Sequence, residues 1–199
     1  AGIPKAQRGF QRKADLALAM IRQARQQRIG FAWVGFDGFY GSDPGWLRAL
    51  DADGEIFVGD VHKDQHIDLA DPEPVVPPPP PSRGRPPRAL QPQTPALRVD
   101  HWAQQQPASA WQRVTLREGT KGPLQVDILH RRVWLWDGEE AQAHGWRLIV
   151  RREVATPTEI KYSVSNAPAE TPVPRLAFMQ GQRYWVERAL QTGKQDVGL

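Results

Sequence analysis

The sequence predicts an α/β fold, because a helix-forming segment is followed directly by a buried strand. Residues 13–28 carry apolar side chains at helical spacing, and residues 31–36 are almost wholly apolar. A second short strand is expected at residues 55–61. Further along, four segments rich in Val, Ile, Leu and Trp predict that β structure continues well beyond this first unit.

The composition allows one domain, or one domain with a large insertion, in 199 residues. Apolar residues make up 40% of the chain and include eight tryptophans, which suffices for a core. The mean hydropathy is −0.57, and the lack of a long apolar run excludes a membrane span. An apolar leader is not visible at the start. The absence of cysteine excludes disulfides and thiolate metal sites and fits a reducing cytoplasm.

The charge favours a polyanionic partner, since 26 Lys and Arg stand against 22 acids and the pI is near 9.7. A net charge of +4 is modest, so the location of the positive residues matters more than their number. The chain begins without Met and ends at Val197-Gly-Leu199 without a polar tail. We therefore expect a fragment of a longer protein.

The first helix is expected over residues 13–28. Asp15 in its first turn and Arg25 and Arg28 in its last turn complement the helix dipole, and Ile29-Gly30 is expected to end it. The face predicted to pack on the core consists of Ala17, Met20, Ile21 and Ala24, at i, i+3, i+4 and i+7.

Residues 31–36 are expected to form a central strand that is buried on both faces. The strand ends in Asp37, followed by Gly38. Reactive groups in open α/β sheets lie at the carboxyl ends of strands, so Asp37 is a candidate functional residue. The alternative is that Asp37 only shapes a turn before glycine.

A short helix is expected to begin at Pro44, with Ser42 or Asp43 as its cap. A turn at residues 51–54 then leads into the second strand. The side chains expected to point inward from this helix are Trp46, Leu47 and Leu50.

The composition changes after residue 61. A polar stretch leads to five consecutive prolines, which are followed by a basic segment containing Arg83 and Arg85. This segment of polyproline character is interpreted as a rigid basic spacer along a nucleic-acid backbone, as a solvated linker, or as an SH3-type ligand.

After the proline-rich segment the pattern is typical of β-strands, and at least three of them should pair antiparallel. Residues 166–168 are expected to break the sheet, and a final helical region should begin near Thr171. The predicted strands cover residues 111–116, 124–136, 146–154 and 159–165.

Several kinds of chemistry lack a motif, because no Gly-x-Ser-x-Gly, Walker loop or Gly-x-Gly-x-x-Gly occurs. His62 and His66 at i,i+4, with Asp60 and Asp64 close by, would suit a zinc site on a helix, but a third ligand is not obvious. The isolated histidines, expected to be structural, are His130 and His144.

The strongest candidate constellation joins Asp37 to a helix over residues 182–194. On such a helix Arg183, Glu187 and Lys194 form one polar stripe. Two carboxylates with divalent cations activate water or a 3′-hydroxyl, magnesium prefers such oxygens, and the cations would hold phosphates. The alternative is a charged surface helix with an i,i+4 Arg–Glu pair.

At these residues the chain resembles bacterial insertion-sequence transposases of the DDE superfamily. The resemblance implies an α/β fold with an RNase H-like core interrupted by a β-rich insertion. Residues 1–61 would form the first part of the core, residues 62–165 the Pro-rich linker and the insertion returning to the core, and residues 166–199 the core helix with the catalytic Glu. The segments that carry the resemblance are 31–44, 119–122, 161–168, 184–194 and 198–199.

The resemblance implies metal-dependent cleavage of DNA at transposon ends and strand transfer of the 3′-hydroxyl into target DNA. Asp37 and Glu187 would be the catalytic residues and the ligands of two Mg²⁺ ions, with Mn²⁺ as a substitute. We expect a cytoplasmic, nucleoid-associated protein that dimerises in the synaptic complex and contacts no membrane. The residues expected to bind DNA are Arg183, Lys194, Lys121, Arg83 and Arg85.

Three positions depart from the family pattern. Gln180 stands where a related signature has Tyr, and Gly38 stands where many relatives have Arg. The first catalytic Asp has no counterpart, because the only acid among residues 1–36 is Asp15. We therefore expect a catalytically incomplete chain. The rival interpretations are a non-enzymatic DNA-binding protein that uses the basic segment and the Arg-rich strands, and an inactive transposase remnant.

Overall fold

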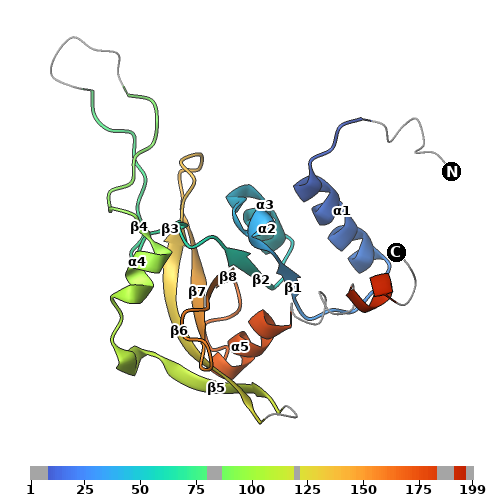
Figure 1. Cartoon of the computed structure of the whole chain (residues 1–199). Helices are drawn as coiled ribbons and strands as arrows, with labels where there is room; N and C mark the ends of the chain where they lie inside the picture. The colour runs from blue at the N-terminus through green and yellow to red at the C-terminus, as the bar shows by residue number, and fades with distance from the viewer. Residues whose placement is uncertain (1–8, 80–86, 119–121, 183–190, 196–199) are drawn as a thin grey trace.

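The computed structural model describes residues 9–79, 87–118, 122–182 and 191–195. Within these ranges the chain forms a curled six-stranded sheet with helices on both faces, and a small two-stranded sheet at the base of an extended arm (Figure 1). Some predicted site residues lie outside the described residues, namely Arg83, Arg85, Lys121, Arg183 and Glu187.

The helices are α1 (Lys13–Gln26), α2 (Gly38–Gly41), α3 (Pro44–Ala52), α4 (Val99–Gln104) and α5 (Val173–Gly181), with a 3-10 turn, η2 (Ala108–Ala110). The strands are β1 (Val34–Phe36), β2 (Phe57–Val61), β3 (His66–Ile67), β4 (Leu97–Arg98), β5 (Gln112–Arg117), β6 (Leu124–Leu135), β7 (His144–Glu153) and β8 (Ile160–Ser165).

The six-stranded sheet has the order β1-β2-β8-β7-β6-β5. β1 and β2 are parallel, and every other neighbouring pair is antiparallel. The prediction that at least three downstream strands pair antiparallel is confirmed. Because β8 pairs with β2, the downstream strands continue the sheet that β1 and β2 begin, and the fold is the predicted mixed α/β type.

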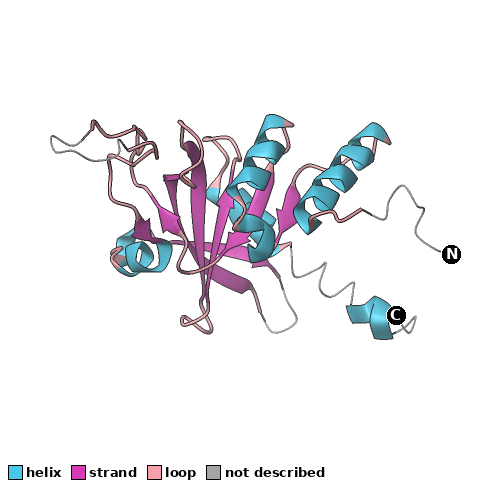
Figure 2. Ribbon diagram, turned by 90° about the horizontal axis from the view of Figure 1, so that it is seen from above, coloured by secondary structure: helices cyan, strands magenta, loops and turns pink. Residues whose placement is uncertain are grey.

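Each face of the sheet has its own hydrophobic core, with α1, α3 and α4 on one face and α5 on the other. Figure 2 shows the helices on either side of the strands. Leu47, Leu50 and Phe57 are almost completely buried in the first core, and burial of each such side chain contributes about 1.5–3 kcal/mol. As predicted, Trp46, Leu47 and Leu50 point inward, and Asp43 caps α3 by accepting a hydrogen bond from the Trp46 N–H.

The strand predicted over residues 31–36 differs from the prediction in length and in position. β1 has three residues, and within the described chain it lies at the edge of the sheet rather than at its centre. The aromatic residues before it find side-chain partners instead. The Arg25 guanidinium lies 3.6 Å from the Phe31 ring centroid, and the Arg175 guanidinium lies 4.5 Å from that of Trp33. These contacts cover the apolar surface that suggested a longer strand.

β1 is held against β2 by an unusually close contact at Gly59. The Phe36 ring lies directly over this residue, and a Cβ at position 59 would fall 1.7 Å from a ring carbon. The same ring packs edge-on against Trp46 with a centroid distance of 4.6 Å. Only glycine therefore allows Phe36 to lie across β2.

α1 is rotated relative to the predicted orientation. Ala14 is buried, and the residues packed on the core beside it are Ala17, Leu18 and Ile21. Met20, which we expected to face the core, is 69% exposed. The observed face begins three residues earlier, which corresponds to a rotation of about 60°.

Ion pairs between α1 and the end of α3 fix this rotation. Arg22 pairs with Asp53, and Arg25 pairs with Glu55 through two hydrogen bonds of 2.7 Å. These residues lie close to where both helices end, so the charged pairs set which face of α1 meets the core.

Both helices end in the same hydrogen-bonded turn with a left-handed residue. In α3 that residue is Gly54, with φ of 73°, and the Glu55 N–H donates to the carbonyl of Leu50. In α1 it is Arg28, with φ of 60°, whereas the sequence had suggested Ile29-Gly30 as the stop. The Ile29 N–H completes the turn by donating to the carbonyl of Ala24.

The proline-rich residues form an arm that extends away from the sheet (Figure 1). Its base is closed by β3 and β4, whose register pairs His66 with Arg98. Further out, Val75 and Gln91 form an isolated bridge. None of the helices that the structure describes has the length and apolar character needed to cross a lipid bilayer.

Candidate functional site

Asp37 lies at the carboxyl end of β1, where the sequence placed it. Its side chain caps α2, because the Phe39 N–H donates to Asp37 Oδ1 at 3.1 Å. The turn role that we considered as the alternative is therefore real. It also fixes the direction of a half-buried carboxylate at the edge of the sheet.

A second carboxylate lies near the carboxyl end of the neighbouring parallel strand. The last residue pair between β1 and β2 joins Phe36 to Gly59, and the next residues along the two strands are Asp37 and Asp60. Sequence analysis had considered Asp60 only as part of a zinc cluster. The signal that could have found it is an acid near the carboxyl end of a second strand, once the two strands are assumed to be parallel.

Asp60 is joined to α5 by a buried chain of hydrogen bonds. Ser163 on β8 donates to Asp60 Oδ1 at 2.8 Å and accepts from Gln180 Nε2 at 2.7 Å. Because the single hydroxyl proton goes to the carboxylate, the Gln180 amide must present its nitrogen to Ser163. Gln180 Oε1 then points elsewhere, and it has no hydrogen-bond partner within the described part of the chain.

A polar hollow of about 580 Å³ opens beside Asp60. The His62 ring borders the Asp37 turn, since a Cβ at Gly38 would lie 3.4 Å from it. Burial, and then the nearby Asp100 carboxylate, raise the pKa of the Tyr162 hydroxyl. The hollow combines carboxylates with lysine amines, and its charged or ionisable lining consists of Asp60, His62, Lys63, Asp100, Lys161 and Tyr162.

The zinc site considered for His62 and His66 is wrong. These residues do not lie on a helix, because the chain turns after β2 and His66 begins β3. A backbone hydrogen bond from the Gln65 N–H to the His62 carbonyl closes this turn. Across residues 9–79, 87–118, 122–182 and 191–195, no three His, Asp or Glu side chains gather as metal ligands.

The two isolated histidines lie on strands away from Asp37. His130 is on β6, where desolvation and then the Arg147 cation lower its pKa. His144 begins β7 and lies 3.2 Å from the Glu140 carboxylate.

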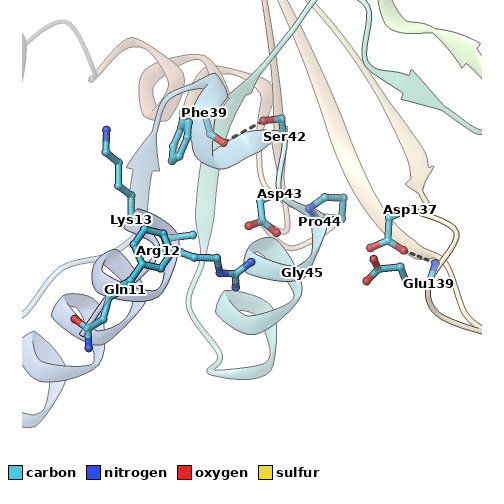
Figure 3. Close-up of a pocket in the computed structure, with 12 residues that line it drawn as sticks. Gln11, Arg12, Lys13, Phe39, Ser42, Asp43, Pro44, Gly45, Asp137 and Glu139 are labelled. Carbon is cyan, nitrogen blue, oxygen red and sulfur yellow. Dashed lines mark hydrogen bonds between the residues drawn. The ribbon is translucent and has the colours of Figure 1, made fainter. Parts of the chain in front are cut away.

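A second hollow, of about 1040 Å³, lies between the start of α1 and the α2–α3 region (Figure 3). Arg12 and Lys13 line one side, and Asp43, Asp137 and Glu139 line the other. Three of its charged side chains are engaged in the fold: Arg12 pairs with Asp15, Asp137 pairs with Arg48, and Asp43 caps α3. We therefore place the candidate site at Asp37 and Asp60 and not in this hollow.

Among the predicted DNA-binding residues, only Lys194 belongs to the described residues. It is exposed in a helical stretch at residues 191–195. The strand register thus places Asp37 beside Asp60, which is linked to Ser163 and Gln180, and the pairing of Asp37 with Glu187 stays a prediction.

Asp37 and Asp60 lie near the carboxyl ends of two parallel strands, which is where open α/β sheets bind their ligands. Residues 1–123 match the family model described as DDE superfamily endonuclease. This match covers more than half of the chain, so the protein belongs to the DDE superfamily endonuclease family. Membership implies a nuclease or transposase type of activity with DNA as the substrate. A comparison with curated proteins found no match.

Proposed function

We propose that the protein acts as a DDE-type DNA transposase, which cleaves phosphodiesters at transposon ends and directs the freed 3′-hydroxyl into target DNA. The observation that carries the proposal is the placement of Asp37. Its carboxylate lies at the carboxyl end of β1 and accepts a hydrogen bond from the Phe39 N–H. Asp60 occupies the neighbouring position on the parallel strand β2.

The second proposed ligand is Glu187. Near the end of α5, Gln180 is linked through Ser163 to Asp60, which neighbours Asp37 in the register of β1 and β2. Glu187 is five residues beyond Gln182, a distance that an extended chain spans in at most about 18 Å. This connection supports the pairing of Asp37 with Glu187.

The donor chemistry fits a divalent metal ion. Carboxylate oxygens are the ligands that Mg²⁺ prefers, and Mn²⁺ accepts the same set. When bound, a metal pair activates the attacking oxygen and stabilises the leaving oxygen. The chain itself would orient Asp37 through the α2 cap and hold phosphates with Lys63 and Lys161 in the hollow, and with Arg183 and Lys194.

We assign two of the three DDE carboxylates to this chain. Asp15, the only acid among residues 1–36, lies at the start of α1 and pairs with Arg12 at 2.8 Å, which does not suit a metal ligand. We therefore expect DNA binding without measurable nicking by residues 1–199. We further propose that two copies act together on transposon ends.

Localised cleavage by iron tests the metal site directly. Fe²⁺ bound in place of Mg²⁺ generates hydroxyl radicals that cut the backbone near the metal. We expect cuts near Asp37 and Glu187 that disappear in Asp37→Asn and in Glu187→Gln. Asparagine caps a helix as well as aspartate does, so Asp37→Asn removes the charge and keeps the α2 cap.

Asp15→Asn is the matched control, because it makes the same chemical change at a carboxylate on α1 that is not proposed as a metal ligand. Cuts that persist in Asp37→Asn would contradict the proposed site, and DNA binding without localised cuts would favour the non-enzymatic interpretation. If residues 1–199 nick transposon-end DNA with Mg²⁺ and Asp37→Asn abolishes this, the assignment of an incomplete triad is wrong.

A further inference from the structure

Two arginines lie directly opposite each other in the β6–β7 ladder. The register pairs Arg132 with Arg147. Directly opposed side chains have Cβ atoms about 4.5–5.5 Å apart, and like charges at this spacing repel. Within the described residues, no carboxylate forms an ion pair with either guanidinium.

Arg147 is held in place by neutral groups. Its guanidinium donates to the carbonyl of Thr171 at 2.9 Å and to that of Ala169, both in the loop before α5. These carbonyls orient the guanidinium but do not neutralise its charge. Arg147 therefore keeps a full positive charge in a fixed position.

Arg132 is positioned by a glycine on the opposite strand. Its guanidinium lies over Gly145, where a Cβ would be 2.8 Å from one of its nitrogens. It also lies 5.4 Å from the Trp134 ring centroid, within range of a cation–π contact. The absence of a side chain at position 145 leaves the space that this arrangement needs.

The two arginines line a notch of about 240 Å³. Ser165 and Asn166 add polar groups to its wall. The one acid in the lining is Asp51, whose Oδ1 accepts from Asn166 Nδ2 at 2.7 Å. The notch thus offers two guanidinium groups to an anion, while the Ser165 hydroxyl already donates to the Phe57 carbonyl.

We propose that the Arg132–Arg147 pair binds a phosphate of the DNA backbone. Guanidinium groups match phosphate oxygens in bidentate geometry, and a phosphate between them would remove their mutual repulsion. The inference rests on the proposed function for the identity of the polyanion. It adds a contact that none of the residues expected from the sequence provides.

The register places this pair on the same face of the sheet as the candidate site. Arg147 lies opposite Ser165, and two residues further along β7 Ile149 lies opposite Ser163, which binds Asp60. Two residues along a strand correspond to about 7 Å. The notch therefore lies on the face of the sheet that also carries the hydrogen bond between Ser163 and Asp60.

The salt dependence of DNA binding tests the proposal. Affinity for a labelled random-sequence duplex is measured by fluorescence anisotropy over a range of KCl concentrations. Each phosphate contact contributes about 0.9 to the slope of log affinity against log salt. We expect Arg132→Gln and Arg147→Gln each to reduce affinity, and the double variant to lower the slope by about one.

Arg113→Gln is the charge-matched control. Arg113 lies on β5 with its side chain on the opposite face, paired with Asp127 at 3.0 Å, and its removal should leave the slope unchanged. An unchanged slope in the double variant, or an equal loss in Arg113→Gln, would overturn the proposal.

Gly145→Val provides a test that removes no charge. The added side chain displaces the Arg132 guanidinium, so duplex affinity should fall while net charge stays at the native value. Inorganic phosphate as a competitor separates the two sources of the anion. If inorganic phosphate displaces the duplex only at concentrations far above that of the duplex phosphates, the pair binds the DNA backbone as proposed. If inorganic phosphate binds the pair tightly and duplex binding does not change, the proposal is wrong. Iron-mediated cleavage at Asp37 reports on the proposed function independently of these measurements.

Discussion

Single residues set how the helices of this protein end. α1 and α3 close with the same turn, yet the left-handed position is Arg28 in one and Gly54 in the other. A residue with a Cβ pays about 1–2 kcal/mol in this region, whereas glycine does not. The chain therefore contains one strained helix end and one relaxed helix end within the same packed unit.

Arg28→Gly should stabilise the protein. Relief of the left-handed strain outweighs the added freedom of the unfolded chain, so the free energy of unfolding should rise by about 0.5–1 kcal/mol. Urea denaturation measures the change. Gly54→Ala at the equivalent position of α3 is the control and should lower stability, and a destabilised Arg28→Gly would show that the arginine side chain contributes more than its strain costs.

Local chemistry made some residues predictable. Asp43 caps α3 and Asp37 lies before α2 because an acid ahead of a helix accepts from the first free N–H groups, which needs no information from elsewhere in the chain. Asp60 and Gln180 were not predictable as partners, since their link passes through Ser163 on a third element. Sequence spacing does not contain that contact.

At the level of elements, tertiary contacts decided what periodicity left open. The helix predicted over residues 13–28 forms over residues 13–26, and its alanine, leucine, methionine and isoleucine side chains are spread over much of its circumference. Ion pairs from Arg22 and Arg25 to the end of α3 select the face. Charged residues thus determined a packing orientation that apolar spacing alone assigned wrongly.

The orientation of α1 can be tested with two neighbouring residues. Ile21→Ala should lower the free energy of unfolding by about 1–2 kcal/mol, because its side chain packs on the core. Met20→Ala should change it by less than about 0.5 kcal/mol, because Met20 is exposed. Chemical denaturation of both variants gives the comparison, and equal losses would contradict the rotation of the helix.

For β1, the apolar composition predicted a longer strand than the structure contains. Apolar content predicted a strand over residues 31–36, but only residues 34–36 pair with β2. Phe31 and Trp33 are instead covered by Arg25 and Arg175. Cation–π partners far along the chain are invisible to a pattern based on hydrophobicity.

For the whole molecule, the sequence predicted the α/β class and the antiparallel strands but not how they join. The composition break after residue 61 suggested a Pro-rich linker and an insertion returning to the core, and the structure shows that β8 pairs directly with β2. Asn166 strengthens this junction by accepting from the Phe57 N–H at 2.8 Å and donating to the Glu55 carbonyl at 2.9 Å. Contacts across more than a hundred residues are set by the complete fold.

This junction predicts that the sheet unfolds as one cooperative unit. Far-ultraviolet circular dichroism and tryptophan fluorescence should give coincident urea transitions, because β2, β6 and β7 each contribute side chains to both cores. Asn166→Ala should shift both transitions to lower urea concentration by the same amount, which corresponds to a loss of about 1–3 kcal/mol in the free energy of unfolding. Two separate transitions would show that the first strands and the later strands fold independently.

The bare backbone at Gly59 has a consequence for how this protein would lose its activity. β1, which ends at Asp37, packs on β2 through the Phe36 ring, which lies over Gly59. A single methyl group added at Gly59 would therefore push β1 away from β2. Harmful natural substitutions are therefore expected at Gly59, which has no polar side chain and lies 22 residues from Asp37 in the sequence (59 − 37 = 22). A survey restricted to charged side chains would overlook such a change and attribute the defect to the chemistry itself.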